Sequence, residues 1–176
     1  FGDGGAITTD DPQIAEKMRI YRNYGSEKRY YNMVVGTNSR LDELQAGLLR
    51  VRLSHMQELT DEKIRIGERY DQELKNDAFA LPKRREHANH VFHQYVIRTK
   101  QRDELIRHLD EKGIGTIIHY PIPPHLAQAY EYLGFKKGDY PVAEQFADEV
   151  LSIPMYNGMT EEEQTYVIEA LNAFRL

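Results

Sequence analysis

The chain has 176 residues, which suits one domain or one domain plus part of another. Its hydrophobic content of 40% and charged content of 29% are typical of an ordinary globular protein. A net charge of −5 argues against generic nucleic-acid binding, and the absence of cysteine excludes disulfides and thiolate metal sites. No apolar run approaches the roughly 18 residues of a membrane helix, so we expect a cytoplasmic protein without membrane contact.

The first residues, FGDGGAITTD, raise the question of whether the chain begins in the middle of a longer protein. The sequence lacks an initiator Met, and Gly2, Gly4 and Gly5 precede a short β-like run. A phosphate-binding glycine loop needs a strand before the glycines and a helix after them. Neither is present here, so the glycines favour a structural turn into a strand.

The first half of the chain carries strong helix signals. The segment DDPQIAEKMRIYRNYG predicts a helix that is capped by Asp10 or Asp11, has Pro12 in its first turn and ends at Gly25. The next segment, SEKRYYNMVVGTN, lacks a clean period and is interpreted as a loop.

A longer helical region follows, in SRLDELQAGLLRVRLSHMQEL and then TDEKIRIGERYDQELKN. Ser39 and Asp42 have the spacing of a capping box, which predicts that the first of these helices starts at Ser39. An apolar stripe supports a helix: Leu41, Leu44, Leu48 and Val51. The two helices together would form a connector between domains.

The pattern changes after the Pro- and charge-rich linker LPKRREHANH. Three segments have the composition of strands: VFHQYVIRT, IGTIIHYP and LSIPMY. Four segments predict helices, with Gly113 after the first, Pro141 opening the third and a Thr160–Glu163 capping box on the fourth: QRDELIRHLDEKG, PPHLAQAYEYLG, PVAEQFADEVL and TEEEQTYVIEALNAF. This alternation predicts an α/β or α+β module with a small sheet from about Val91 to Leu176.

Two stretches are candidate binding sites. In IIHYPIPPHL, an apolar strand leads into His119 and Tyr120, and a stiff proline turn leads on to His125. Such side chains can exchange or donate protons, but this stretch alone slightly favours the alternative of a His–Tyr pair packed beneath a proline loop. In GTNSRLDELQ, Asn38 would lie at a helix start, where free N–H groups and Arg40 could attract a phosphate; helix capping is the alternative.

A metal site is not expected. His87, His90 and His93 are spaced three apart, but they span a linker and the start of a strand, and the sequence has no HExxH scaffold. Surface or structural roles are favoured for all three.

Four long segments resemble the DegT/DnrJ/EryC1/StrS family of PLP-dependent sugar aminotransferases: FGDGGAITTDDPQIAEKMRIYRNYG, VGTNSRLDELQAGLLRVRL, KGIGTIIHYPIPPHLAQAY and LGFKKGDYPVAEQFADEVLSIPMYNGMTEEE. The resemblance implies an α/β fragment of the fold-type-I (aspartate aminotransferase-like) PLP-dependent transferases. Residues 1–50 would end the large PLP-binding domain, residues 51–90 would form a helical connector and linker, and residues 91–176 would form the small C-terminal α+β domain. The lysine that binds pyridoxal 5'-phosphate would lie just upstream of Phe1, so this chain alone would be inactive and would contain no catalytic residue.

The resemblance also assigns roles to individual residues. Asn38 matches the asparagine that reaches the PLP phosphate of the other subunit of a homodimer, so a shared active site is implied. His119 and Tyr120 match residues that face the sugar nucleotide or the cofactor, and they are expected on the substrate side. His125 and Arg40 match nearby positions and are also expected on the substrate side. The implied reaction transfers an amino group, with glutamate as the expected donor, to a dTDP-3-keto-6-deoxyhexose.

Two alternatives stay open at this point. One is a PLP-dependent sugar dehydratase with histidine in place of the upstream lysine, and the other is a non-catalytic regulatory protein on the same scaffold. Two positions depart from the family pattern: Thr37, where an aromatic residue is commoner, and Asn157, where proline is commoner.

Overall fold

A computed structural model describes residues 4–175, so the predictions for Phe1 and Gly2 lie outside the described residues. The chain divides into two compact units, residues 1–56 and residues 57–176. The predicted domain boundaries at residues 50 and 90 stay predictions.

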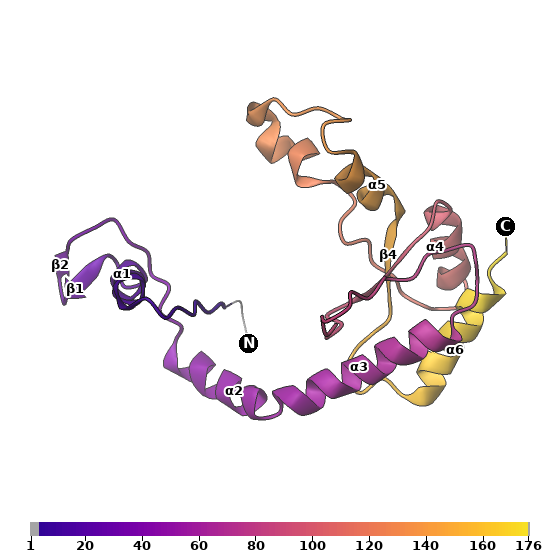
Figure 1. Cartoon of the computed structure of the whole chain (residues 1–176), viewed down its shortest axis with the longest axis horizontal. Coiled ribbons are helices and arrows are strands. Elements are labelled where there is room, and N and C mark those ends of the chain that lie inside the picture. Colours follow the sequence, from indigo (N-terminus) through magenta and orange to yellow (C-terminus); the bar gives the residue numbers. More distant parts are fainter. Residues whose placement is uncertain (1–3, 176) are drawn as a thin grey trace. The chain divides into compact units, whose positions relative to one another are not determined.

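The first unit contains α1 (Pro12–Tyr21), β1 (Ser26–Lys28), β2 (Tyr31–Asn32) and α2 (Glu43–Ser54) (Figure 1). The prediction of α1 holds at its start, because the Asp11 carboxylate accepts hydrogen bonds from the Gln13 and Ile14 amides and Pro12 opens the helix. The prediction of a strand after Gly5 is wrong, since residues 4–9 form no strand.

The predicted loop after α1 is instead a small antiparallel hairpin of β1 and β2. Gly25 makes it possible by adopting φ of +70° beside the returning backbone. A Cβ atom at Gly25 would lie 1.8 Å from the Val34 carbonyl oxygen, so only glycine fits there. The Asn32 side-chain amide also donates to the Tyr24 carbonyl at 2.6 Å, which closes the hairpin.

The predicted capping box at Ser39 and Asp42 is wrong. The α2 helix begins at Glu43, after Asp42, whose side chain makes no capping hydrogen bond. Ser39 instead lies in extended backbone, where its amide donates to the Arg22 carbonyl at 2.9 Å. Leu41 has φ of +66°, a left-handed conformation that keeps the helix from starting earlier.

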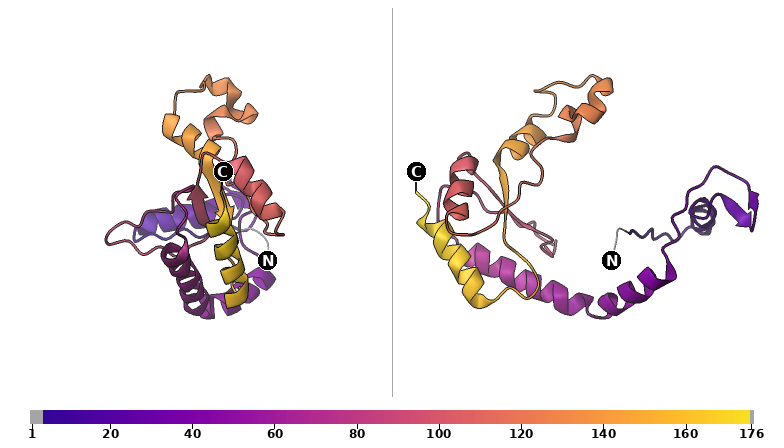
Figure 2. Two further views of the ribbon diagram at one scale, coloured as in Figure 1. Left: turned by 90° about the vertical axis from the view of Figure 1, so that its right-hand side faces the viewer. Right: turned by 180° about the vertical axis from the view of Figure 1, so that it is seen from behind.

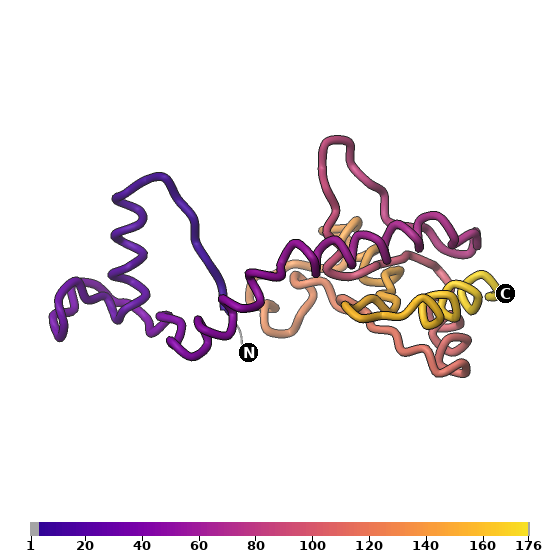
Figure 3. The backbone as a smooth tube through the Cα atoms, turned by 90° about the horizontal axis from the view of Figure 1, so that it is seen from below, coloured from indigo at the N-terminus to yellow at the C-terminus, as the bar shows by residue number. Residues whose placement is uncertain are grey.

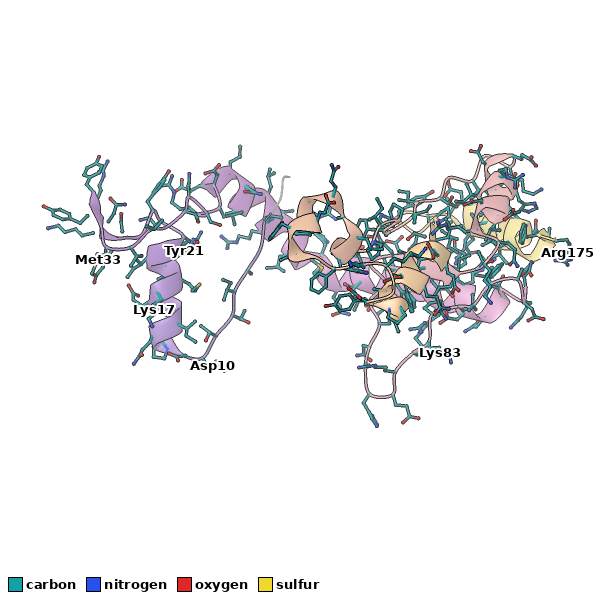
Figure 4. The ribbon with its side chains drawn as sticks, turned by 90° about the horizontal axis from the view of Figure 1, so that it is seen from above. Asp10, Lys17, Tyr21, Met33, Lys83 and Arg175 are labelled. Atoms are coloured by element: carbon teal, nitrogen blue, oxygen red, sulfur yellow. The ribbon has the colours of Figure 1, made fainter. Side chains whose placement is uncertain are left out.

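The described part of the first unit buries no large apolar side chain. Even the predicted apolar stripe of α2 is exposed, with Leu44 at 79% and Val51 at 63%. Figure 4 shows side chains such as those of Tyr21 and Met33 standing on the outside of this unit. Among its described residues, this unit therefore has no hydrophobic core of its own.

The second unit contains the remaining elements: α3 (Met56–Glu73), β3 (Tyr95–Arg98), α4 (Arg102–Asp110), the 3₁₀ helices η1 (Pro124–Leu126) and η2 (Gln128–Leu133), α5 (Pro141–Glu149), β4 (Val150–Ile153) and α6 (Glu161–Ala173). Helix α6 lies beside α3, as Figure 2 shows. Gln164 on α6 donates to the Ile66 carbonyl of α3 at 2.8 Å, within the buried interior. The predicted capping box of Thr160 and Glu163 is confirmed at the start of α6.

Strands β3 and β4 pair antiparallel, with Tyr95 opposite Ile153 and Arg98 opposite Val150. The core collects around this pair from α3, α4 and α6, and its fully buried members include Tyr70, Leu105 and Leu171. The sequence predicted three strands and a helix PPHLAQAYEYLG in this unit. The structure differs at the second of these strands and at this helix.

The segment predicted as the middle strand forms only one bridge, between Ile117 and Ser152, because the following prolines cannot extend a ladder. The segment predicted as the helix PPHLAQAYEYLG forms η1 and η2 instead, and ends at Gly134. The linker between α3 and β3 loops outward near Lys83 (Figures 3 and 4).

Candidate functional site

Asn38 lies in an exposed, extended segment of the first unit and forms an antiparallel bridge with Asn23. Its side-chain oxygen Oδ1 accepts a hydrogen bond from Arg40 Nε at 3.1 Å. This bond fixes the amide with its NH₂ group pointing away from Arg40. Among residues 4–175 no group accepts a hydrogen bond from that NH₂, so it is available to an acceptor outside this chain.

The Arg40 guanidinium lies 5.4 Å from the centre of the Tyr24 ring, which holds it beside Asn38. An amide donor and a cation are thus presented together, a combination suited to a phosphate group. The prediction that Asn38 occupies a helix N-terminus is wrong, since α2 starts five residues later. Free helix amides therefore do not contribute at this point.

Residues 36–39 are held in place by the end of α1. The Thr37 amide donates to the Tyr21 carbonyl at 2.9 Å, and the Tyr24 amide donates to the Thr37 carbonyl at 2.9 Å. A Cβ atom at Gly36 would lie 2.1 Å from the Gly25 nitrogen, so the two backbones touch. Backbone contacts rather than side-chain burial position Asn38.

His119 lies in the second unit, half-buried beside the β3–β4 pair. Its Nδ1 atom is 2.9 Å from Ser152 Oγ on β4, and its Nε2 atom is 3.1 Å from the Gln94 amide nitrogen, directly before β3. Both ring nitrogens are therefore within hydrogen-bond distance of groups of this unit. The ring of Tyr120 stands edge-on to the imidazole, with centroids 5.4 Å apart.

Tyr120 is 72% exposed, and its hydroxyl makes no hydrogen bond to any described residue. Next to His119 and Tyr120 is an apolar pocket of about 560 Å³ between the proline turn and α5. Ile122, Val142 and Phe146 contribute to its walls. His119 and Tyr120 thus both line this pocket, and their role in a site stays a prediction.

His125 lies on η1 and is turned inward, with its side chain only 8% exposed. Its Nε2 atom is 3.0 Å from the Glu144 carboxylate on α5. The same carboxylate accepts hydrogen bonds from the backbone amides of Gly138 at 2.8 Å and Tyr140 at 3.3 Å. Burial opposes ionisation of Glu144, but the hydrogen bonds from Gly138 and His125 hold the pKa of Glu144 below its ordinary value. This geometry gives His125 a hydrogen bond that joins the proline turn to α5.

No cluster of three or more metal-binding side chains occurs in the described range. Helices long and apolar enough to cross a membrane are likewise missing from residues 4–175. His90 lies against the Phe92 ring, with a centroid separation of 4.3 Å, and its Nδ1 atom accepts from the Phe92 amide at 3.0 Å.

Sequence reasoning missed three residues of this site: Gln94, Ser152 and Glu144. Gln94 and Ser152 carry no local signal, because only the pairing of distant segments brings them to His119. Glu144 had one available signal, since an acidic residue in the first turn of a helix that starts with proline often bonds to preceding amides.

The family model described as the DegT/DnrJ/EryC1/StrS aminotransferase family matches residues 1–172. The chain belongs to this family. Its match covers both units, including Asn38 and the segment from His119 to Glu144.

Individual members of the DegT/DnrJ/EryC1/StrS family are similar along the whole chain. A dTDP-3-amino-3,6-dideoxy-alpha-D-galactopyranose transaminase of Aneurinibacillus thermoaerophilus is 42% identical over 171 residues, covering 97% of this chain and 47% of that protein. The erythromycin biosynthesis sensory transduction protein EryC1 of Saccharopolyspora erythraea is 45% identical over 174 residues, covering 98% of this chain and 48% of that protein.

The fold also matches a solved structure of the family. The crystal structure of S. venezuelae DesV in complex with a ketimine intermediate superposes with a TM-score of 0.90 at 40% identity, covering 93% of this chain and 44% of the other. The chain spans about half the length of the curated relatives it matches. It is a partial α/β fold of the fold-type-I transferases, and the predicted fold class is confirmed.

Proposed function

We propose that this chain is the carboxy-terminal part of a PLP-dependent aminotransferase that aminates a nucleotide-linked keto-deoxysugar. The favoured substrate is a dTDP-3-keto-6-deoxyhexose, with glutamate as amino donor. The observation that carries the proposal is the similarity over 97% of this chain to a protein named as a dTDP-3-amino-3,6-dideoxy-galactopyranose transaminase. The proposed protein works in the cytoplasm, where sugar nucleotides are made.

The residues of the first unit fit the phosphate of pyridoxal 5'-phosphate. Asn38 offers an unpaired NH₂ donor while Arg40 holds its oxygen and adds positive charge. Both groups are exposed, so they can reach a cofactor held by another subunit. When bound, PLP supplies the electron sink that amino-group transfer requires.

The residues of the second unit fit the sugar-nucleotide side. The free hydroxyl of Tyr120 can hydrogen-bond a sugar or phosphate oxygen, and the adjoining apolar pocket can exclude water from it. The role of these residues is to orient the keto-sugar, because correct placement of the two reactants accounts for a large part of such rate enhancements. His125 supports this surface through Glu144.

The proposed active form is a homodimer with a shared site. A donor that acts across subunits has no function in a monomer, and the first unit exposes large apolar side chains, such as Tyr30 at 81% and Val35 at 94%. Exposed apolar surface of this kind is typical of protein–protein contacts. Sedimentation of the full-length protein as an active monomer would contradict the shared site.

A second function has a specific observation in its favour. The relative EryC1 carries the name of a sensory transduction protein, so a non-catalytic regulatory protein on the same scaffold is the competing proposal. A sugar dehydratase is a further alternative that depends on the residue upstream of Phe1. The three functions predict different outcomes when the full-length protein is mixed with glutamate and then with keto-sugar nucleotide.

The test follows the absorbance of bound PLP in the full-length protein through the two half-reactions. An aminotransferase converts its cofactor with glutamate and restores it with the keto-sugar while amino-sugar forms. A dehydratase releases water from the sugar and forms no amino-sugar, and a regulatory protein does neither. Absence of both half-reactions with every dTDP-keto-sugar tried would reject the aminotransferase.

Two variants test the residue assignments within that assay. Asn38→Ala should weaken PLP retention by about 1–3 kcal/mol, because a hydrogen bond to a charged phosphate is lost. His119→Ala should keep PLP and the glutamate half-reaction while slowing transfer to the keto-sugar. The opposite pattern, with cofactor lost from His119→Ala and kept by Asn38→Ala, would mean that the two roles are wrongly assigned.

A further inference from the structure

Both ring nitrogens of His119 lie within hydrogen-bond distance of side chains of the same unit. Ser152 Oγ lies 2.9 Å from Nδ1 and the Gln94 amide lies 3.1 Å from Nε2. A neutral imidazole has one donor and one acceptor nitrogen, so these two neighbours use both of them. A ligand could hydrogen-bond to His119 only by displacing Ser152 or Gln94.

Ser152 is a rigid anchor for this ring. It is 7% exposed in the middle of β4. Its amide donates to the Ile117 carbonyl at 2.8 Å, and its carbonyl accepts from the Ile117 amide at 3.2 Å. Three hydrogen-bonding contacts from this one residue therefore hold the backbone at 117 and the side chain at 119.

Gln94 provides the second anchor, from the position directly before β3. It directly precedes Tyr95, the first residue of β3, whose ring is fully buried and whose hydroxyl donates to Asp71 at 2.6 Å. The backbone at Gln94 is therefore positioned by the buried residue that follows it. The imidazole is held between Ser152 on β4 and the residue that directly precedes β3, and these two strands are paired.

Tyr120 lies beside His119, and its hydroxyl is available for a hydrogen bond to a ligand. Its ring stands at 87° to the His119 ring, with a centroid distance of 5.4 Å, and its hydroxyl has no partner among the described residues. The pocket beside it is lined mainly by apolar side chains such as Ile122 and Phe146. A fixed imidazole on one side limits the positions that the Tyr120 ring can take at the pocket.

We infer that Gln94 and Ser152 are positioning residues of the sugar-nucleotide side, which act by clamping His119 so that it orients Tyr120. In this arrangement the Tyr120 hydroxyl touches the ligand, and His119 acts through Tyr120 rather than on the sugar. The inference rests on the proposed function for the identity of the ligand. The clamp itself is a property of this chain.

The kinetic test uses the full-length protein and five variants, one of which is His119→Ala. Ser152→Ala, Gln94→Ala and Tyr120→Phe should each raise KM for the keto-sugar several-fold, with the glutamate half-reaction and PLP absorbance unchanged. Thr99→Val is the matched control: Thr99 is 4% exposed beside β3 and donates to the Ala78 carbonyl, so its loss removes an equally buried hydroxyl away from His119. Its KM should equal that of the wild type.

The outcomes separate the two proposals. If the wild type transfers no amino group to any keto-sugar, the proposed function fails. If the wild type transfers it, and Ser152→Ala and Gln94→Ala match Thr99→Val while His119→Ala is impaired, the clamp is refuted and His119 contacts the sugar itself. A wild-type KM for Tyr120→Phe would also refute the inference.

The contacts that hold His119 can also be tested without enzyme turnover. Nitrogen-15 spectra of the histidine rings in this 176-residue chain should show a single tautomer for His119. Ser152→Ala should convert that signal to a tautomer mixture, whereas Thr99→Val should leave it unchanged. A tautomer mixture already present in the wild type would overturn the inference, whatever the kinetics.

Discussion

Replacing Asn157 by alanine should destabilise the second unit, because this residue ties the turn before α6 to helix α3. Its side-chain NH₂ group donates to the Leu59 carbonyl at 2.7 Å and to the Glu62 carboxylate at 2.7 Å. The Gly158 amide adds a third hydrogen bond to the same carboxylate at 2.9 Å. This turn leads directly from β4 into α6, so its position affects how α6 packs.

The magnitude follows from the two bonds that are lost. A hydrogen bond to a charged group contributes about 1.5–3 kcal/mol, and one to a carbonyl contributes about 0.5–1.5 kcal/mol. Both acceptors are near the surface, so water replaces part of this loss and the net cost is about 2 kcal/mol. For a unit of this size, such a loss lowers Tm by about 8 °C.

The assay is thermal unfolding of the 176-residue chain, followed by calorimetry. Asn89→Ala is the matched control, because Asn89 is exposed in the linker loop and its side chain makes no hydrogen bond to described residues. Asn157→Asp is the sharper variant. It places a second carboxylate against Glu62, so it should be less stable than Asn157→Ala near neutral pH and should recover on acidification.

The reasoning would be refuted if Asn157→Ala and Asn89→Ala unfolded at the same temperature as the wild type. It would also be refuted if Asn157→Asp were as stable as the wild type at neutral pH. Either result would mean that the contact with Glu62 does not hold the turn.

Two further predictions concern stability. Hydrogen bonds from the Asn157 side chain and the Gly158 amide hold the pKa of Glu62 below its ordinary value of 4.5. The stabilisation by Glu62 is therefore complete above about pH 4.5 and is lost as the pH falls through its lower folded pKa; urea midpoints should drop over this window, and less so in Asn157→Ala. Gly67→Ala should cost about 1–3 kcal/mol, since a Cβ atom there would lie 2.6 Å from the Phe92 ring. Gly115→Ala, with nothing within 4 Å, is the control, and equal Tm values for the two variants would contradict the predicted clash.

Local signals in the sequence determined several helix boundaries. Asp11 with Pro12 starts α1, and Thr160 with Glu163 starts α6, because each cap forms within four residues and needs no distant partner. Pro141 likewise opens α5. The family resemblance also predicted the fold class and the candidate site residues. The roles of these residues stay predictions.

Tertiary contacts decided the rest. The capping spacing at Ser39 is overridden because residues 37–39 hydrogen-bond with the end of α1 and are extended. The segment before His119 has the composition of a strand, but it forms a single bridge to Ser152.

The clamp on His119 was also beyond sequence reasoning, because Gln94, His119 and Ser152 are separated by 25 and 33 residues and meet only in the folded unit. A cap or a first-turn proline acts on amides of its own helix, so its effect can be read from adjacent letters. A hydrogen bond between side chains on different segments depends on which strands pair and in which register. That pairing depends on burial of the whole core around Tyr95 and Leu151. The residues of this core come from several segments, so no single stretch of the sequence predicts the pairing.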